Sequence, residues 1–330
     1  MTVNPHLCLV SNQPVPSLTP LIDPKLGVTH ATLVAAPDRK LHAEWLKTAL
    51  VRHGIGSELI LLRDGYHLPR LREDFAAIAA RFPTGATVNL TGGTKLMTLA
   101  AWDAFTRPQD RLYYVHIGHD RIDWLHPAGQ AAHPISDRVK LDVYLAAHGL
   151  DLLPPGPQRQ AMSTADHQNL RNRAHKLHRQ KGPSRTLAAV GGGWLEELVF
   201  EEIRRLAEQD VKIHDVARQF RINYGDVYQR RLISELDVAC LRDNTLYLIE
   251  CKTGQSGVGA NAATALFKLA ELSDTLGGVR GRGLFVSTEI VSTDLHQRAR
   301  QLGLSIIDRP CLIDLPGHLG RALRPAQNAG

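Results

Sequence analysis

Two pairs of charged residues, each spaced two residues apart, flank a predicted turn. The first pair is Glu235 and Asp237, and the second is Glu250 and Lys252. The turn is Asp243-Asn244, because both residue types tolerate the positive φ that a two-residue hairpin requires. If only these two residues are unpaired, Asp237 lies opposite Glu250, with Cβ atoms about 5 Å apart, and the other two charges also face each other. The spacing therefore predicts a hairpin that gathers carboxylates and an ammonium group on one face.

The facing carboxylates favour a metal site. Two like charges opposed across strands repel, so a purely structural hairpin would avoid pairing Asp237 with Glu250. Mg²⁺ or Mn²⁺ would resolve the conflict, because both prefer oxygen ligands and Mg²⁺ keeps several waters, which leaves room for a phosphate and an attacking water. Lys252 could then position or deprotonate that water, or neutralise charge on phosphorus. The alternative is a solvated charged face, but the other residues of both strands are mostly apolar, which indicates burial.

A helix before the hairpin, and a helix and a strand after it, would position these groups. Apolar residues recur at helical spacing over residues 194–209, and a turn of about 100° per residue puts Glu196 and Glu202 inside the apolar arc. An acid in that arc needs a partner. Downstream, the sequence predicts a helix over residues 260–276 and a strand over residues 283–287.

This order of elements resembles the core of the PD-(D/E)XK nuclease superfamily. The resemblance places Asp237, Glu250 and Lys252 at the catalytic motif positions, with the two carboxylates as metal ligands. It also places Glu196 where many members carry a helix acid, and a supporting or surface role is the alternative for this residue. The implied fold is restriction-endonuclease-like α/β, and the implied activity is metal-dependent hydrolysis of phosphodiesters in DNA, RNA or both.

The first half of the chain alternates predicted strands and helices. Strands are expected at residues 7–10, 32–36, 58–62, 86–90 and 111–117. Helices are expected near residues 39–53, 69–82 and 94–105. Such alternation indicates a parallel, doubly wound, Rossmann-like α/β sheet, in which ligands bind beyond the carboxyl ends of the strands.

Small and polar residues follow two of these predicted strands. The first strand ends in Ser11-Asn12-Gln13, and a later one runs through Thr91-Gly92-Gly93-Thr94-Lys95 into a helix. The glycines would let backbone N–H groups approach an anion, and the helix N-terminus adds donors and a positive dipole end. The alternative is that the glycine pair serves packing alone. The run is neither a Walker loop nor a G-x-G-x-x-G fingerprint, which argues against a nucleoside triphosphatase and a dinucleotide oxidoreductase.

The two strand ends together resemble the CRISPR-associated Rossmann, or CARF, domain, which senses cyclic oligoadenylates. A CARF domain followed by a PD-(D/E)XK domain is the architecture of the cyclic-oligoadenylate-activated ancillary nucleases of type III CRISPR defence. The resemblance covers essentially the whole chain. It implies that residues 11–13 and 91–95 bind the activator, with cyclic tetra-adenylate as the expected ring. A homodimer is also expected, because a ring of repeated units matches a site that is built twice.

Length and composition fit two intracellular domains. At 330 residues the chain can bury two cores. A Pro-rich stretch predicts a linker over residues 151–165, between a CARF domain over 1–150 and a nuclease domain over 166–330. No apolar run is long enough to span a bilayer and no secretory segment begins the chain, so a cytoplasmic location is expected. Four cysteines are expected as reduced core residues of strands, namely Cys8, Cys240, Cys251 and Cys311.

Basic residues gather near the start of the predicted nuclease domain, just before the Gly-rich start of the helix over residues 194–209. The net charge of +6 favours a polyanionic partner without specifying one. Four basic residues in one polar stretch are candidates for contacts with a nucleic-acid backbone, namely Arg171, Arg173, Lys176 and Arg179. A solvated helix is the alternative. Lys268, on the helix after the hairpin, is a further candidate, with an ordinary surface lysine as its alternative.

Two other functions are compatible with the same sequence. A ligand-independent DNA endonuclease of the restriction or repair type would use its first domain only to dimerise. A CARF-type transcription regulator would carry a nuclease domain that has become a binding module. The intact Asp237, Glu250 and Lys252, and the lack of an obvious helix-turn-helix pattern, argue against the regulator.

Overall fold

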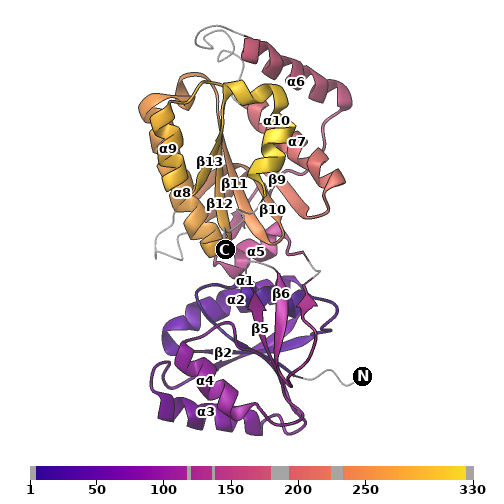
Figure 1. Cartoon of the computed structure of the whole chain (residues 1–330), viewed down its shortest axis with the longest axis vertical. Coiled ribbons are helices and arrows are strands. Elements are labelled where there is room, and N and C mark those ends of the chain that lie inside the picture. Colours follow the sequence, from indigo (N-terminus) through magenta and orange to yellow (C-terminus); the bar gives the residue numbers. More distant parts are fainter. Residues whose placement is uncertain (1–4, 117–119, 136–137, 180–192, 224–232, 325–330) are drawn as a thin grey trace. The chain divides into compact units, whose positions relative to one another are not determined.

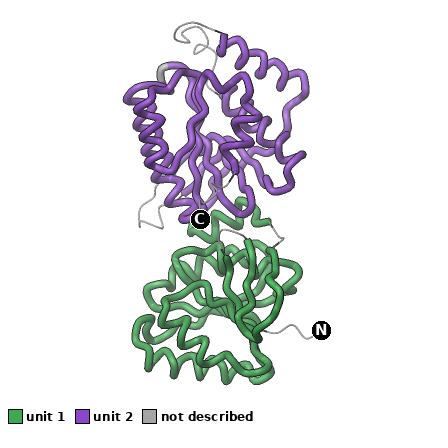
Figure 2. The backbone as a smooth tube through the Cα atoms, in the orientation of Figure 1, with its two compact units in different colours: residues 1–150 green, residues 151–330 purple. Residues whose placement is uncertain are grey.

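The chain folds into two compact units, each with its own sheet. The computed structural model describes residues 5–116, 120–135, 138–179, 193–223 and 233–324. The units comprise residues 1–150 and residues 151–330 (Figure 2). Both combine helices with one sheet, so the predicted α/β class is confirmed for each. No helix within the described ranges is both long enough and apolar enough to cross a membrane.

The first unit is built on a seven-stranded sheet in the order β3-β2-β1-β4-β5-β6-β7. Its strands are β1 (His6–Leu9), β2 (His30–Ala35), β3 (Gly56–Leu61), β4 (Thr87–Asn89), β5 (Arg111–His116), β6 (Arg121–His126) and β7 (His133–Pro134). The first five pair in parallel, and β6 and β7 extend the sheet antiparallel. Successive strands run outward in opposite directions on either side of the β1–β4 boundary, which is therefore the topological switch point.

Helices lie on both sides of this sheet (Figure 1). They are α1 (Val15–Ile22), α2 (Lys40–Arg52), α3 (Leu68–Ala80), α4 (Lys95–Ala104) and α5 (Leu141–Ala147). Helices α3 and α4 bury Phe75 and Met97 in one core cluster with Leu7 and Leu9 of β1. Helices α1, α2 and α5 instead pack against one another. The eight predicted elements of this half are present with ends displaced by at most two residues, apart from Ile117, which lies outside the described residues.

The second unit is built on a six-stranded sheet in the order β13-β12-β11-β10-β9-β8. Its strands are β8 (Asp151–Leu153), β9 (Ile213–Asn223), β10 (Ile233–Arg242), β11 (Thr245–Lys252), β12 (Gly281–Ser287) and β13 (Leu304–Ile307). Pairing is antiparallel from β8 to β11 and parallel from β11 to β13. Antiparallel hairpins therefore meet a parallel βαβ unit at β11, the strand that carries Glu250 and Lys252.

Helices pack against both faces of this sheet. They are α6 (Thr164–Arg179), α7 (Gly193–Gln209), α8 (Gly259–Gly277), α9 (Thr293–Gln301) and α10 (Leu315–Ala322). The apolar side of α7 shares a core cluster with Val238, Ile249 and Cys251. Side chains alternate along a strand, so Asp237 and Glu250 belong to the opposite face, and α8 packs on β11 and β12.

The segment predicted as a linker belongs to the second unit. Residues Asp151–Leu153 form β8 and pair with β9, and Gln158 forms a further bridge to Arg218. The units divide after residue 150, where the first domain is predicted to end, and the predicted linker contains a short edge strand because extended segments with prolines also occur at sheet edges. Among the cysteines, all four are free thiols, but Cys311 lies in a 3₁₀ helix, η5 (Arg309–Asp314), and not in a strand.

Candidate functional site

The acidic hairpin has the predicted turn and register. Asp243 and Asn244 connect β10 to β11 with φ values of 46° and 56°, as expected for a two-residue turn of the primed type. The ladder begins at Arg242–Thr245 and continues in register to Val238–Ile249. The strands are also buried, since Val238 and Ile249 are nearly inaccessible to solvent. Local turn chemistry and alternation were therefore sufficient to predict this part of the site.

Beyond Val238 the two strands separate, and this is where the acids lie. The ladder stops one residue before Asp237 and Glu250. Instead, the Asp237 side chain extends the connection, because its Oδ2 accepts the backbone N–H of Cys251 at 2.8 Å. Glu235 does not form the predicted pairing with Lys252, because the described ladder ends at Val238–Ile249; it is exposed and pairs with Arg221 of β9, on the other side of β10. The two carboxylates therefore lie just beyond the end of the backbone ladder.

The electrostatics of the hairpin show the expected conflict between like charges. Burial, followed by the charge of Glu250, raises the pKa of Asp237 from 3.8 to about 7. The Lys252 ammonium group forms an ion pair with Glu250. Burial alone would lower the pKa of Lys252, but the hydrogen bond and charge of Glu250 outweigh it and raise the pKa. Lys252 is therefore a cation at neutral pH, which suits it to position and neutralise groups and not to remove a proton from water.

Glu196 on the first turn of α7 contributes to the same electrostatic cluster. Its charge is among the causes that raise the pKa values of Asp237 and of the Cys251 thiol. Its Oε2 accepts a hydrogen bond from the Gln219 amide at 3.3 Å. Glu202, the other acid predicted in the apolar arc, is buried and contacts His167 at 2.9 Å. The two acids therefore have different surroundings: Glu196 contributes to the charge around Asp237, whereas Glu202 pairs with His167.

Asp237 and Glu250 fit a hard divalent cation. Within the described ranges no group of three or more His, Cys, Asp or Glu side chains is placed to hold a metal. Mg²⁺ does not need such a group, since it is commonly bound through one or two carboxylates while keeping several waters. The pKa of Asp237 is raised by burial first and by the charge of Glu250 second, and a positive partner would offset the second of these causes. A zinc centre would require a denser donor set.

The two polar segments of the first unit lie at neighbouring strand ends. β1 pairs in parallel with β4, with Cys8 beside Asn89. Ser11-Asn12-Gln13 and the Thr91–Lys95 run therefore leave the same edge of the sheet at the switch point between β1 and β4. This is where doubly wound sheets bind ligands, and the predicted convergence of the two segments agrees with the topology.

The hydroxyl groups of this region build the loop itself. Ser11 Oγ accepts the backbone N–H of Gln13 at 3.2 Å. Thr91 Oγ1 donates to Asn89 Oδ1 and accepts the N–H of Val115, both at 2.7 Å. Thr94 caps α4, since its Oγ1 accepts the N–H of Met97 at 3.1 Å and donates to the Gly65 carbonyl at 2.7 Å. These contacts shape the loop before any ligand is present.

The glycine pair is required by packing as well as by any ligand. A Cβ atom on Gly92 would lie 1.8 Å from the Leu9 carbonyl oxygen, and Gly93 has a φ of +73°. The packing role that the sequence analysis gives as an alternative therefore applies to these glycines. Two long polar side chains are exposed here, Asn12 and Lys95. Neither makes a hydrogen bond or ion pair with another part of the chain that the structure describes.

Asn89, at the start of this polar run, supports the loop, a role that the sequence analysis does not assign to it. Its side chain is fully buried. Its Nδ2 donates to the Pro16 carbonyl at 2.9 Å, and its Oδ1 accepts the N–H of Thr91 at 3.0 Å. One amide thus ties the segment after β1 to the loop after β4. A polar residue within an otherwise apolar strand was the available signal.

The predicted nucleic-acid contacts divide into two groups. Arg171 lies 3.5 Å from Glu202, and the Arg173 guanidinium stacks 4.4 Å above the centre of the Trp194 ring. Both arginines therefore have partners that join α6 to α7. Lys176 and Arg179 on α6, and Lys268 on α8, are exposed instead. These three keep the availability that a phosphate contact requires.

Comparisons with known proteins agree with both halves of the site. Residues 6–144 match the Card1 CARF domain family, and residues 184–324 match the family of Card1-like endonuclease domains. No curated protein matches the chain in sequence.

Solved structures share the fold over the whole chain. Protein VC1899 from Vibrio cholerae has a TM-score of 0.81 and 22% identity, covering 97% of this chain and 98% of that one. Can2 from Sulfobacillus thermosulfidooxidans, in complex with cyclic tetra-adenylate, has a TM-score of 0.77 and 19% identity, covering 98% of each chain. A type III CRISPR defence DNA nuclease activated by cyclic oligoadenylate has a TM-score of 0.67 and 19% identity, covering 100% of this chain and 52% of that one. The predicted order of a CARF domain and a nuclease domain is thus confirmed, because the chain combines a Card1 CARF domain with a Card1-like endonuclease domain.

Proposed function

We propose that this chain is a metal-dependent nuclease that a cyclic oligoadenylate switches on, acting in the cytoplasm in type III CRISPR defence. The observation that carries this proposal is the placement of Asp237, Glu250 and Lys252 where two strands of an endonuclease-family domain diverge. The raised pKa of Asp237 beside Glu250 supports a cation between them. The CARF domain, and the activators named for two structural relatives, support control by the ring.

Each residue of the hairpin then has a distinct task. Asp237 and Glu250 would hold Mg²⁺ or Mn²⁺, which when bound lowers the pKa of a water and stabilises charge on the phosphate. Lys252 remains protonated, so its ammonium group orients the attacking water and neutralises charge that develops on phosphorus. Glu196, whose charge contributes to the raised pKa of Asp237, would accept a hydrogen bond from that water. Cleavage would release products with phosphate at one end and hydroxyl at the other.

The activator would bind at the switch point of the first unit. Lys95 and Asn12 can contact phosphate or base groups of the ring, and the loop N–H groups at the start of α4 offer donors to an anion. Ser11, Gln13, Thr91 and Thr94 would act mainly through the loop shape that their contacts establish. Gly92 and Gly93 permit the close packing of that loop. We propose cyclic tetra-adenylate as the ring, because Can2 is described in complex with it.

We propose that the ring is bound by two copies of the chain. A ring of identical units is matched by a site repeated about a two-fold axis. Helix α4 starts in the activator loop and carries Leu99 and Trp102, which remain 53% and 39% exposed. These apolar side chains lie on the same helix as Lys95, so a second copy of α4 is the occupant that best fits them. Binding shifts the nuclease toward an active state only if the ring prefers that state.

The substrate is a nucleic acid, and we propose DNA, RNA or both. We assign contacts with its phosphate backbone to Lys176, Arg179 and Lys268, because these three predicted residues are exposed. Their contacts would be salt-dependent, because neutralised phosphates release counterions. Arg171 and Arg173 would support this surface by fixing α6 on α7.

One incubation series tests the proposal. The purified protein is mixed with plasmid, single-stranded DNA or single-stranded RNA, with each cyclic oligoadenylate or none, in Mg²⁺, Mn²⁺ or EDTA. We expect cleavage only with metal and activator together, and none by the Asp237→Asn variant. Cleavage without any activator would favour the ligand-independent endonuclease. Activator binding without cleavage of any substrate would favour the CARF-type regulator.

A further inference from the structure

A left-handed residue in β9 lies directly beside Asp237. Phe220 pairs with Leu236 and Arg218 pairs with Val238, so the residue opposite Asp237 is Gln219. Its φ is +49°, a conformation that costs an ordinary side chain free energy and persists only where the surroundings impose it. Such strain is concentrated at functional sites, which makes the contacts of Gln219 informative.

The positive φ lets two consecutive side chains reach the same helix. Neighbouring residues of a regular strand point to opposite faces. Here Arg218 Nη1 donates to Glu197 at 3.0 Å, and Gln219 Nε2 donates to Glu196 at 3.3 Å. The two acceptors, Glu196 and Glu197, are consecutive residues near the start of α7. The kink in β9 therefore holds the start of α7 at two adjacent points.

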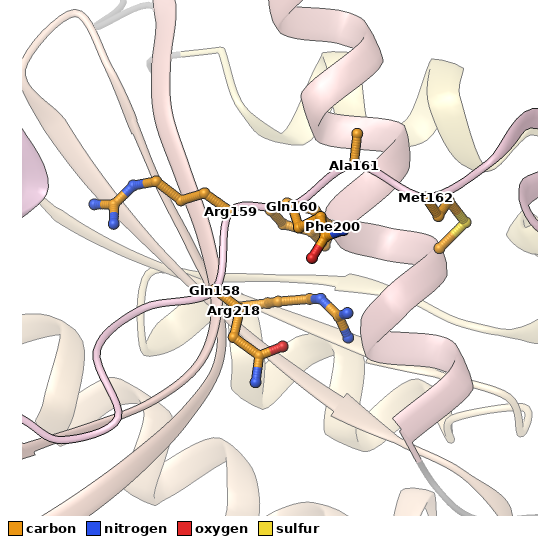
Figure 3. Close-up of a pocket in the computed structure, with 7 residues that line it drawn as sticks. All are labelled: Gln158, Arg159, Gln160, Ala161, Met162, Phe200 and Arg218. Carbon is orange, nitrogen blue, oxygen red and sulfur yellow. The ribbon is translucent and has the colours of Figure 1, made fainter.

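The position of this kink is fixed by neighbours on both sides. Arg218 exchanges two backbone hydrogen bonds of 3.0 Å with Gln158, and its guanidinium lies 5.6 Å from the centre of the Phe200 ring. Figure 3 shows Arg218 directed from β9 toward the helix that carries Phe200, at the wall of a 290 Å³ cavity. On the other side, the Gln219 amide nitrogen is 3.6 Å from where a Cβ of Gly193 would be.

We propose that Gln219 is a positioning residue that holds the Glu196 carboxylate near Asp237 at the end of the β10–β11 ladder. This inference rests on the proposed nuclease function and deepens it. Glu196 would otherwise be repelled by the Asp237 carboxylate. A neutral amide can restrain it without competing with a metal ion, whereas a lysine or arginine at this position would pair with the acids itself.

The side chain can be tested apart from the backbone. Gln219→Gly adopts a φ of +49° without strain and removes only the amide. Asp215→Gly is the matched control, because Asp215 has the same φ on the same strand and its carboxylate pairs with Arg159. We expect Gln219→Gly to lower kcat about tenfold to a hundredfold, as for loss of one hydrogen bond to a charged group, with KM for nucleic acid nearly unchanged. The control should keep wild-type kcat.

A double-mutant cycle asks whether Gln219 acts through Glu196. In a Glu196→Ala background, adding Gln219→Gly should change kcat by less than about twofold. A full additional loss there would overturn the proposal, as would a Gln219→Gly variant that keeps kcat but raises KM. The concentration of Mn²⁺ that half-saturates the protein, read from the paramagnetic resonance of free Mn²⁺, should rise several-fold in Gln219→Gly and not in Asp215→Gly. This readout needs no cleavage, so equal Mn²⁺ binding by wild type and Gln219→Gly overturns the inference even if the wild type cuts no nucleic acid and the proposed function fails.

Discussion

Replacing Asp237 by asparagine should stabilise the metal-free protein at alkaline pH. Burial and the charge of Glu250 raise the pKa of Asp237 from 3.8 to about 7. The folded state therefore holds this proton more tightly than the unfolded state, and the free energy of unfolding falls as pH rises between these two values. Each pH unit in that window costs at most about 1.4 kcal/mol, so the full cost approaches about 4 kcal/mol above pH 7.

Asparagine removes the titration and keeps the local hydrogen bond. Its side-chain oxygen can still accept the Cys251 N–H that Asp237 accepts at 2.8 Å. We therefore expect the free energy of unfolding of Asp237→Asn to exceed that of wild type by about 2 to 4 kcal/mol at pH 8 in EDTA. The difference should fall to less than half of that by pH 5, where Asp237 in the folded wild type is already protonated.

Scanning calorimetry of the full chain in EDTA, from pH 5 to pH 8, measures this difference. For a domain of this size each kcal/mol moves the midpoint by about 2 to 4 °C. Glu271→Gln is the control, because Glu271 is an exposed carboxylate on α8. Added Mn²⁺ should narrow the gap, since the cation stabilises only the wild-type pair. A variant no more stable than wild type at pH 8, or a gain that is equal at pH 5 and pH 8, would refute the argument.

Four further variants separate catalysis, activator binding, loop packing and assembly. Lys252→Met should lower the activated cleavage rate by about 10²- to 10³-fold, as for loss of one preorganised charge, while a Mn²⁺ titration still shows binding. Lys95→Ala should weaken activator binding in a calorimetric titration without lowering the midpoint of thermal unfolding. Gly92→Ala should lower that midpoint, because its Cβ would lie 1.8 Å from the Leu9 carbonyl oxygen. Equal midpoints for the two variants would contradict this division. Leu99→Glu with Trp102→Glu should shift light-scattering mass toward a monomer, and an unchanged mass would exclude α4 from the dimer contact.

The predictable parts of the fold are those that local sequence determines. The β10–β11 hairpin follows from one dipeptide turn and from alternation, and its register was predicted to the residue as far as Val238–Ile249. The first-unit strands follow from apolar runs separated by helical periodicity. Such patterns need no knowledge of distant residues, which is why the fold and three motif residues could be inferred from the sequence.

The unpredicted parts depend on partners that are distant in sequence. β9 escaped notice because its segment mixes charged and apolar residues, and its alternation is broken by positive φ values at Asp215 and Gln219. β8 is a three-residue strand that forms only against β9. The use of Thr94 as a helix cap, and of Gly92 for packing on Leu9, likewise becomes visible only when β1 and β4 are side by side.

The same dependence explains why the nuclease centre lies where it does. At Asp237 the β10–β11 ladder ends, Gln219 of the neighbouring strand β9 has a positive φ, and the first turn of α7 contributes Glu196. Each feature is unfavourable alone: an open ladder, a strained φ and a set of like charges. Together they gather carboxylates at one place, and Lys252 is paired with Glu250 there. A divalent cation would offset the repulsion among these carboxylates, so the local cost in stability and the proposed catalytic function have the same physical origin.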